Sequence, residues 1–283
     1  MSNLRFELKY ALRSVASSPI FWICFLIAFM IGLLNAQWSL GVNFPIEQMY
    51  AQLNEKDSLI NRLSAFGFWL YDSRFIYSTF YFKILPVLVL LPFSGSFLSD
   101  SNSHYLEQLI TRLGAKSYVR YRVLCCIISA LLISCIPMIA SQLLVSIKYP
   151  YFQPHPEYGI YFGLVSESFM TTLFYSNAWL HLLVSLVMVG GMCSIWSVFV
   201  LSCSRFFSNE YLMIFILFLL QLVIENFALS VGRSVPILTI GAYLNIHTAL
   251  AKSIYVMLLV PLAYMIATAV FLKLEKRMLL ERG

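Results

Sequence analysis

The sequence predicts an all-α polytopic membrane protein whose single domain, residues 1–283, contains six transmembrane helices. Two observations lead to this fold class. First, 60% of the residues are hydrophobic and only 11% are charged, whereas a soluble domain carries about 25% charged residues. Second, the apolar residues form runs long enough to cross the ~30 Å hydrocarbon core of a bilayer, which takes about 20 helical residues. These runs occupy most of the chain, so no large soluble domain is expected.

Six apolar runs are candidate spans. Prolines within them are tolerable because neighbouring helices can satisfy the freed carbonyl groups. The pair Gly190–Gly191 in the fourth run indicates close helix packing or a bend. The first run is too long for the core of a cleaved signal peptide and has bulky Leu34 three residues before a cleavage point after Ala36, so we expect it to remain as a span. The predicted spans are Pro19–Gln37, Phe80–Phe97, Val123–Ile147, Trp179–Cys203, Tyr211–Phe227 and Ile254–Phe271.

The 19 lysine and arginine residues predict that both termini are cytoplasmic. With the N-terminus inside, the shorter, inner segments hold the larger share of them, as the positive-inside rule requires. Because the basic residues flank apolar runs, membrane lipid is the expected partner and nucleic acid is not. The basic residues of the inner segments are Arg5, Lys9, Arg13, Arg112, Lys116, Arg120, Arg122, Arg205, Lys273, Lys276, Arg277 and Arg282.

Three segments outside the spans have patterns of their own. Residues 1–18 are predicted to form an amphipathic interfacial helix, because apolar and basic residues each recur at helical spacing before the Ser17–Ser18–Pro19 stop. Residues 38–79 form the longest outer loop, which ends in FGFWLYDSRFIYSTFYF, a run typical of an aromatic belt at the outer interface. Residues 226–250 are apolar but broken by glycine and proline, which favours short re-entrant or interfacial helices before the last span.

The inner loop 100–121 contains a short charged helix. Leu106, Leu109, Ile110 and Leu113 fall at i, i+3, i+4 and i+7, one face of a helix over Tyr105–Leu113, and Gly114 is placed to end it. A helix of this length is about 14 Å long and cannot span a bilayer. It is either a docking helix for a cytoplasmic partner or a surface connector on lipid headgroups. The basic residues that follow, Arg112, Lys116, Arg120 and Arg122, are expected to anchor the next span to the anionic inner leaflet.

This order of elements resembles the membrane (permease) subunit of a type-2 ATP-binding-cassette (ABC) exporter. At the residue level the resemblance rests on FLSDSNSHYLEQLITRLGAKSYVRYRV, residues 97–123: an acidic residue, a short helix, a Thr-Arg pair, then Tyr and a basic residue. One departure is that Arg120 and Arg122 stand where a lysine is expected. The resemblance implies a coupling helix that fits a cleft of an ATPase subunit. The residues so assigned are Tyr105, Leu106, Glu107, Leu109, Ile110, Arg112 and Leu113.

The resemblance also implies the partners: an ABC ATPase in two copies and a second permease, identical or related. The sequence has no G-x-x-x-x-G-K-[ST] motif, so the chain is not expected to be an enzyme. We expect no cofactor on this chain, with ATP and Mg on the ATPase. The implied function is export of a hydrophobic or amphipathic substrate, such as a peptide, drug or lipid-like molecule, across the cytoplasmic membrane of a bacterial cell.

Two other functions stay open. A secondary transporter usually shows inverted repeats and ionisable residues near the midplane, and neither pattern is visible. A toxin-immunity or signalling membrane protein is the other alternative. Glu225 lies inside an apolar run with Gln221 one turn earlier, so the two are predicted to line the substrate path or its outer gate, unless Glu225 is simply hydrated at headgroup level. The scattered histidines, His104, His155, His181 and His247, and the six cysteines predict neither a metal site nor a disulfide framework.

Overall fold

The computed structural model describes residues 3–53, 64–70, 76–103, 105–153, 170–231 and 254–281. Within these ranges the chain is helical, with turns and two short 3-10 segments and no strand, as the predicted fold class requires. The helices are α1 (Asn3–Ser17), α2 (Pro19–Leu53), α3 (Ile76–Leu90), α4 (Ser96–Asn102), α5 (Tyr105–Leu113), α6 (Ala115–Lys148), α7 (Thr171–Ser176), α8 (Ala178–Ser202), α9 (Glu210–Val231) and α11 (Ile254–Glu281). The 3-10 segments are η1 (Ala65–Gly67) and η3 (Ser204–Phe206).

Four helices are long and apolar enough to cross a membrane. They are Pro19–Gly41 within α2, Ala115–Lys148, Ala178–Ser202, and Glu210–Phe227 within α9. Two further apolar helical stretches, Ile76–Leu90 and Leu259–Lys273, lie in the second and sixth predicted regions and are shorter. The chain is therefore a multi-pass membrane protein.

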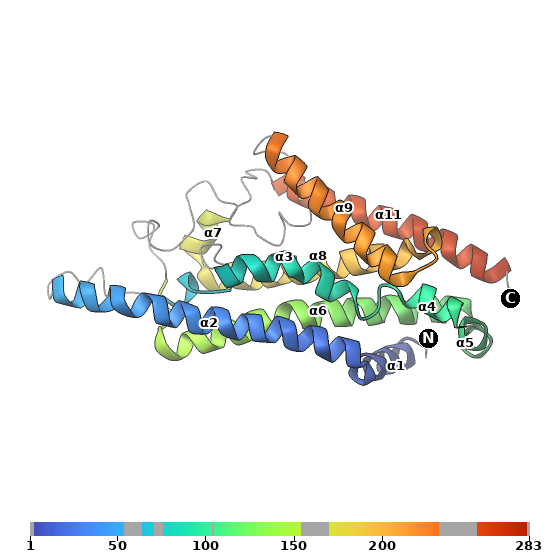
Figure 1. Ribbon diagram of the computed structural model, residues 1–283, viewed down its shortest axis with the longest axis horizontal. Coiled ribbons are helices and arrows are strands. Elements are labelled where there is room, and N and C mark those ends of the chain that lie inside the picture. Colours follow the sequence, from blue (N-terminus) through green and yellow to red (C-terminus); the bar gives the residue numbers. More distant parts are fainter. Residues whose placement is uncertain are drawn as a thin grey trace.

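The long helices pack around α6. Among the described residues, α6 contacts α1, α2, α3, α5, α8 and α11, and a single buried cluster of apolar side chains connects most of these helices. Successive long helices alternate in direction, so that α5 and both chain termini lie at the same end of the molecule (Figure 1). We call this the α5 end.

Two helices extend well past the ends of the apolar runs. α2 continues beyond Gln37 to Leu53, into the segment predicted as an outer loop, and α11 continues beyond Phe271 to Glu281. The continuation of α11, LKLEKRMLLE, consists mainly of good helix formers, whereas that of α2, WSLGVNFPIEQMYAQL, remains helical although it contains Gly41 and Pro45. Hydropathy locates the part of a helix that lies in lipid, but it does not show where the helix ends.

The second predicted span, Phe80–Phe97, is not one continuous helix. α3 ends at Leu90, a turn covers residues 91–95, and α4 follows. Pro92 has no N–H to donate and its ring opposes a continued helix. The turn still keeps helical bonds from Leu91 N to Val87 O (3.1 Å) and from Ser94 N to Leu90 O (3.1 Å), so the break is local.

The aromatic run predicted as an outer belt is buried in its first described part, whereas Phe80 in α3 is 52% exposed. Phe66, Phe68 and Trp69 are only 6%, 4% and 5% exposed. The backbone of Ala65 fixes the segment to α6 and its C-terminal extension, because its N–H donates to Pro150 O (3.1 Å) and its carbonyl accepts from Gln142 Nε2 (3.2 Å). These hydrogen bonds draw the aromatic rings inward, where Phe68 packs on Tyr149.

Much of the predicted re-entrant segment, residues 226–250, lies outside the described residues. Its first part, up to Val231, continues α9. The remainder, residues 232–250, is not described.

Candidate functional site

The short helix α5 has the bounds that the sequence predicts, Tyr105–Leu113. Gly114 ends it: its N–H donates to Ile110 O at 2.8 Å, and its φ of +77° lies in the region that favours glycine. Gly114 is also the residue before α6, whose first turn bonds back to it through Tyr118 N at 3.0 Å. A single residue with positive φ therefore joins α5 to the central helix.

The described part of the apolar face of α5, Leu109 and Ile110, is directed into its own chain. Leu109 is 6% exposed and belongs to the main buried cluster, and Ile110 packs against the same cluster. Glu107, Gln108 and Thr111 are exposed. The resemblance assigned Leu109 and Ile110 to contacts with a partner, and that assignment stays a prediction; within the single chain Leu109 is already buried. The amphipathic pattern identifies a face that becomes buried, but it does not say which surface covers it.

The remaining predicted coupling residues are Tyr105, Leu106, Arg112 and Leu113. Their backbone belongs to α5, and their side chains lie outside the described residues. The described outward surface of α5 thus consists of Glu107, Gln108 and Thr111, which we call the α5 polar face.

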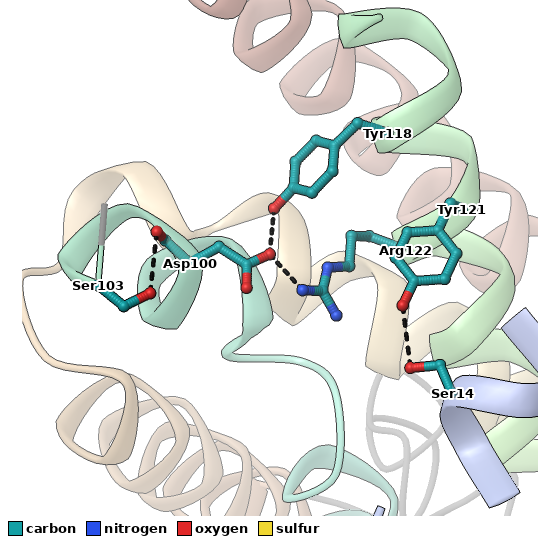
Figure 2. Close-up of polar contacts among 6 residues, drawn as sticks. All are labelled: Ser14, Asp100, Ser103, Tyr118, Tyr121 and Arg122. Carbon is teal, nitrogen blue, oxygen red and sulfur yellow. Dashed lines mark hydrogen bonds and ion pairs between the residues drawn. The ribbon is translucent and has the colours of Figure 1, made fainter. Parts of the chain in front are cut away.

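Directly before α5, Asp100 of α4 forms a buried ion pair with Arg122 of α6 (Figure 2). The two residues are 7% and 9% exposed. The same carboxylate oxygen accepts a hydrogen bond of 2.5 Å from the Tyr118 hydroxyl. The guanidinium carbon of Arg122 also lies 5.7 Å and 5.1 Å from the ring centroids of Tyr118 and Tyr121, within the range of cation–π attraction.

Two further contacts join the start of α6 to α1. Arg120 Nη2 lies 3.0 Å from Glu7 Oε1, and the Tyr121 hydroxyl lies 2.9 Å from Ser14 Oγ (Figure 2). The expectation that Arg120 and Arg122 anchor the helix to lipid headgroups is wrong for Arg122, which is enclosed by protein. Arg120 is in an intermediate position: its side chain is 42% exposed, and it pairs with Glu7, whose side chain is 5% exposed. Each of these arginines pairs with an acidic residue of another helix, Glu7 of α1 or Asp100 of α4. Counting charges along one segment does not reveal such pairs.

On its other side, α4 contacts the beginning of α9. A Cβ added to Gly95 would lie 2.8 Å from Glu210 Cβ, so the missing side chain permits this approach. Ser99 also lies beside the Glu210 carboxylate, and Asn102 Nδ2 donates to Ser208 O at 3.2 Å. α4 therefore touches α6 and α9 and is followed directly by α5.

Gln221 and Glu225 lie farther along α9, away from this network. Gln221 is 6% exposed, and its Oε1 has no hydrogen-bond partner within the described part of the chain. Glu225 is half-buried, and Lys83 of α3 is close enough to interact with it electrostatically. The sequence placed Gln221 and Glu225 on one helical face, but it gave no reason to pair Glu225 with Lys83 from another helix.

The described histidine and cysteine residues form no ligand cluster. No group of three or more His, Cys, Asp or Glu residues suited to a metal ion occurs among the described residues. His181 is buried in α8 with its ring edge against Phe174, while His104, His155 and His247 lie outside the described residues. All six cysteines are free.

Comparisons with known proteins add no identification. No family model, curated protein or solved structure matches the chain. At the α5 end, a short helix with an outward polar face is joined through Gly114 to α6 and follows α4, which contacts α6 and α9.

Proposed function

We propose that this chain is the permease subunit of an ATP-driven ABC exporter, with six spans and both termini in the cytoplasm of a bacterial cell. A separate ATPase docks at the α5 end and supplies ATP hydrolysis. The substrate is hydrophobic or amphipathic, such as a peptide, drug or lipid-like molecule, and a second permease completes the path. The alternation of the long helices, with both termini beside α5, supports this topology (Figure 1).

The observation that carries the proposal is the orientation of α5. A connector lying on lipid headgroups would present its apolar side chains to the membrane. Instead Leu109 is buried in the protein core and Glu107, Gln108 and Thr111 are exposed. A short helix held by its apolar face, with polar groups directed outward, is suited to contact a soluble subunit.

A secondary transporter is the second candidate, and one observation favours it. Glu225 is half-buried on α9 and interacts with Lys83 of α3, and ionisable residues within membrane helices often belong to ion pathways. Glu225→Gln removes the titratable carboxyl and keeps the side-chain size. If the Glu225→Gln protein loses a proton-dependent uptake or efflux that the unmodified protein shows in liposomes, this second candidate is favoured.

The proposed function is tested by purifying the protein from its native membrane in a mild detergent and identifying co-purifying proteins. The test variant is Glu107→Arg with Thr111→Arg, which changes the α5 polar face and leaves buried Leu109 intact. Ser17→Arg is the control, because Ser17 is exposed on α1 and its side chain bonds only within its own helix, to Ser14 O. We expect an ATPase with the unmodified protein and the control, and its loss from the double variant. Absence of an ATPase from all three samples would overturn the proposal.

A further inference from the structure

The side of α9 that faces the protein changes character along the helix. Its buried described residues are Met213, Ile214 and Gln221, and Leu217 packs on the main buried cluster. These positions recur at helical spacing, so they form one stripe, which is apolar near the α5 end. The stripe becomes polar at Gln221 and, one turn later, at Glu225. Glu225 lies about 22 Å along the helix axis from the first residue of α9, away from the α5 end.

Gln221 and Glu225 carry hydrogen-bond acceptors that the described chain does not use. Gln221 is 6% exposed, and its Oε1 has no hydrogen-bond partner among the described residues. No hydrogen bond or ion pair joins the Glu225 carboxylate to another described residue. Residues four apart lie on the same helical face, so the two acceptors are neighbours. Because a buried acceptor without a donor is costly, the two are suited to receive a donor from a ligand.

The described cation that acts on Glu225 is Lys83 of α3, through an electrostatic interaction without direct ion pairing. α3 is one of the helices that pack on α9. Lys83 is exposed, and a lysine side chain can keep its ammonium group in water while its stem lies along apolar surface. Lys83 therefore balances part of the charge of Glu225 and leaves the carboxylate oxygens accessible to another donor.

Apolar side chains adjoin these polar groups on both helices. Phe80 is 52% exposed and lies on the same face of α3 as Lys83, three residues later. On α9, Ile224 is next to Glu225 in sequence and is 43% exposed. A ligand that fits this region needs a positively charged donor group and an apolar portion beside it.

We propose that Gln221 and Glu225 recognise the cationic head of an amphipathic substrate, a protonated amine whose N–H groups donate to Gln221 Oε1 and to the Glu225 carboxylate. The apolar portion of the substrate lies against Phe80, Ile224 and the adjoining lipid. Lys83 is the counter-ion that the substrate replaces at Glu225. This inference rests on the proposed function and deepens it by naming the chemical class of the substrate.

The test is ligand binding by the whole protein in nanodiscs of phosphatidylcholine, measured by fluorescence anisotropy with empty nanodiscs as the blank. The probe is a dansyl-labelled alkyl primary amine. One analogue carries a trimethylammonium group, which keeps the charge but has no N–H donor, and the other carries an acetylated amine, which is neutral. We expect the primary amine to bind at least about tenfold more tightly than either analogue, because charge-assisted hydrogen bonds are the strong ones. Equal affinity for the primary amine and either analogue would overturn the proposal.

Two variants remove one acceptor property each. Glu225→Gln keeps the side-chain size and removes the charge, while Gln221→Leu keeps the size and removes the buried acceptor. Each should weaken binding of the primary amine at least about tenfold. Asn226→Ala is the control, because Asn226 is exposed and its side chain bonds within its own helix, to Leu222 O. Unchanged amine binding by Glu225→Gln would contradict the site.

Lys83→Gln gives a result that a folding defect cannot imitate. The substitution removes the cation that competes with the ligand for Glu225, so the primary amine should bind several-fold more tightly than it binds the unmodified protein. Weaker binding would show that Lys83 does not compete with the ligand, and it would overturn the proposal.

The outcomes separate the two proposals, because the binding assay needs no ATPase. If an ATPase co-purifies with the protein but the primary amine binds no better than its analogues, the amine site is wrong and the proposed function stands. If the amine binds as expected and no ATPase co-purifies, the proposed function fails, and the amine site favours the secondary transporter.

Discussion

α6 and α9 are both long apolar helices, but the protein uses them in opposite ways. Within the described residues, α6 packs against α1, α2, α3, α5, α8 and α11, whereas α9 exposes most of its bulky side chains, including Tyr211, Phe215 and Phe227 at 64%, 57% and 67%. Hydrophobicity does not separate the two, because lipid is as apolar as the protein interior. The number of small residues distinguishes the two helices. In α6, Cys126, Ser129, Ala130 and Ser134 lie where neighbouring helices approach, and close approach favours helix association in membranes.

The largest expected effect concerns the ion pair that ties α4 to α6. Arg122→Ala should lower the free energy of unfolding by about 3–5 kcal/mol, because it leaves the buried Asp100 carboxylate without its partner. The double variant Asp100→Leu with Arg122→Met should cost less than Arg122→Ala, since no buried charge remains. Unfolding in detergent by heat or denaturant measures both. Equal stability of Arg122→Ala and the unmodified protein would contradict the buried position of this pair.

A second prediction contrasts two neighbouring residues of α9. Met213 is 0% exposed and Leu212 is 51% exposed. Met213→Ala should lower the free energy of unfolding by about 2 kcal/mol through a cavity against the rest of the protein. Leu212→Ala should change it by less than about 0.5 kcal/mol, because lipid replaces the lost contacts. The two residues are adjacent in α9, but one is buried and the other is exposed. Similar losses of unfolding free energy in the two variants would show that α9 is covered by protein on both faces.

A third prediction tests the contact of α8 with α6 through two adjacent glycines. A Cβ on Gly190 would lie 2.7 Å from Cys135 Sγ and 2.9 Å from Leu131 Cδ2, whereas one on Gly191 meets nothing within 4 Å. Gly190→Ala should destabilise by about 1–2 kcal/mol because α8 must move away from α6. Gly191→Ala should be neutral or slightly stabilising, since alanine favours helix over glycine by about 1 kcal/mol. A loss of stability in Gly191→Ala would contradict the register of this interface.

The smallest expected effect is local to α5. Gly114→Ala should destabilise the α5–α6 junction by about 1 kcal/mol, because a φ of +77° with a ψ of 144° is a conformation that essentially only glycine adopts. Space is not the cause, as a Cβ at Gly114 would meet nothing within 4 Å. Hydrogen–deuterium exchange of α5 should rise several-fold. Gly41→Ala, also in open space but without positive φ, should leave exchange of α5 unchanged.

The sequence predicted the positions of the helices better than the contacts between them. Apolar runs located the membrane regions, and the spacing of Leu106, Leu109, Ile110 and Leu113 gave the bounds of α5. The difference between α6 and α9 was also accessible, because serine, cysteine and alanine recur in α6 and bulky residues fill α9. The interruption of the second predicted span at residues 91–95 was not accessible from Pro92, because Pro86, Pro137 and Pro261 lie inside continuous helices.

The contacts at the α5 end were not accessible in this way. Asp100 and Arg122, Glu7 and Arg120, and Ser99 and Glu210 each join helices far apart in sequence or separated by a turn. Single-sequence charge patterns favour solvent or headgroups for such residues, since most charged side chains are exposed. Their pairing depends on how α1, α4 and α9 meet α6.

By itself, then, the sequence determined that this chain is a helical membrane protein, because hydrophobicity and helical periodicity are local properties. The tertiary structure decided which apolar faces meet protein and which remain free, and which charges are paired. It turned Leu109 inward and enclosed Arg122, since burial is a property of two surfaces in contact and a sequence pattern describes only one of them.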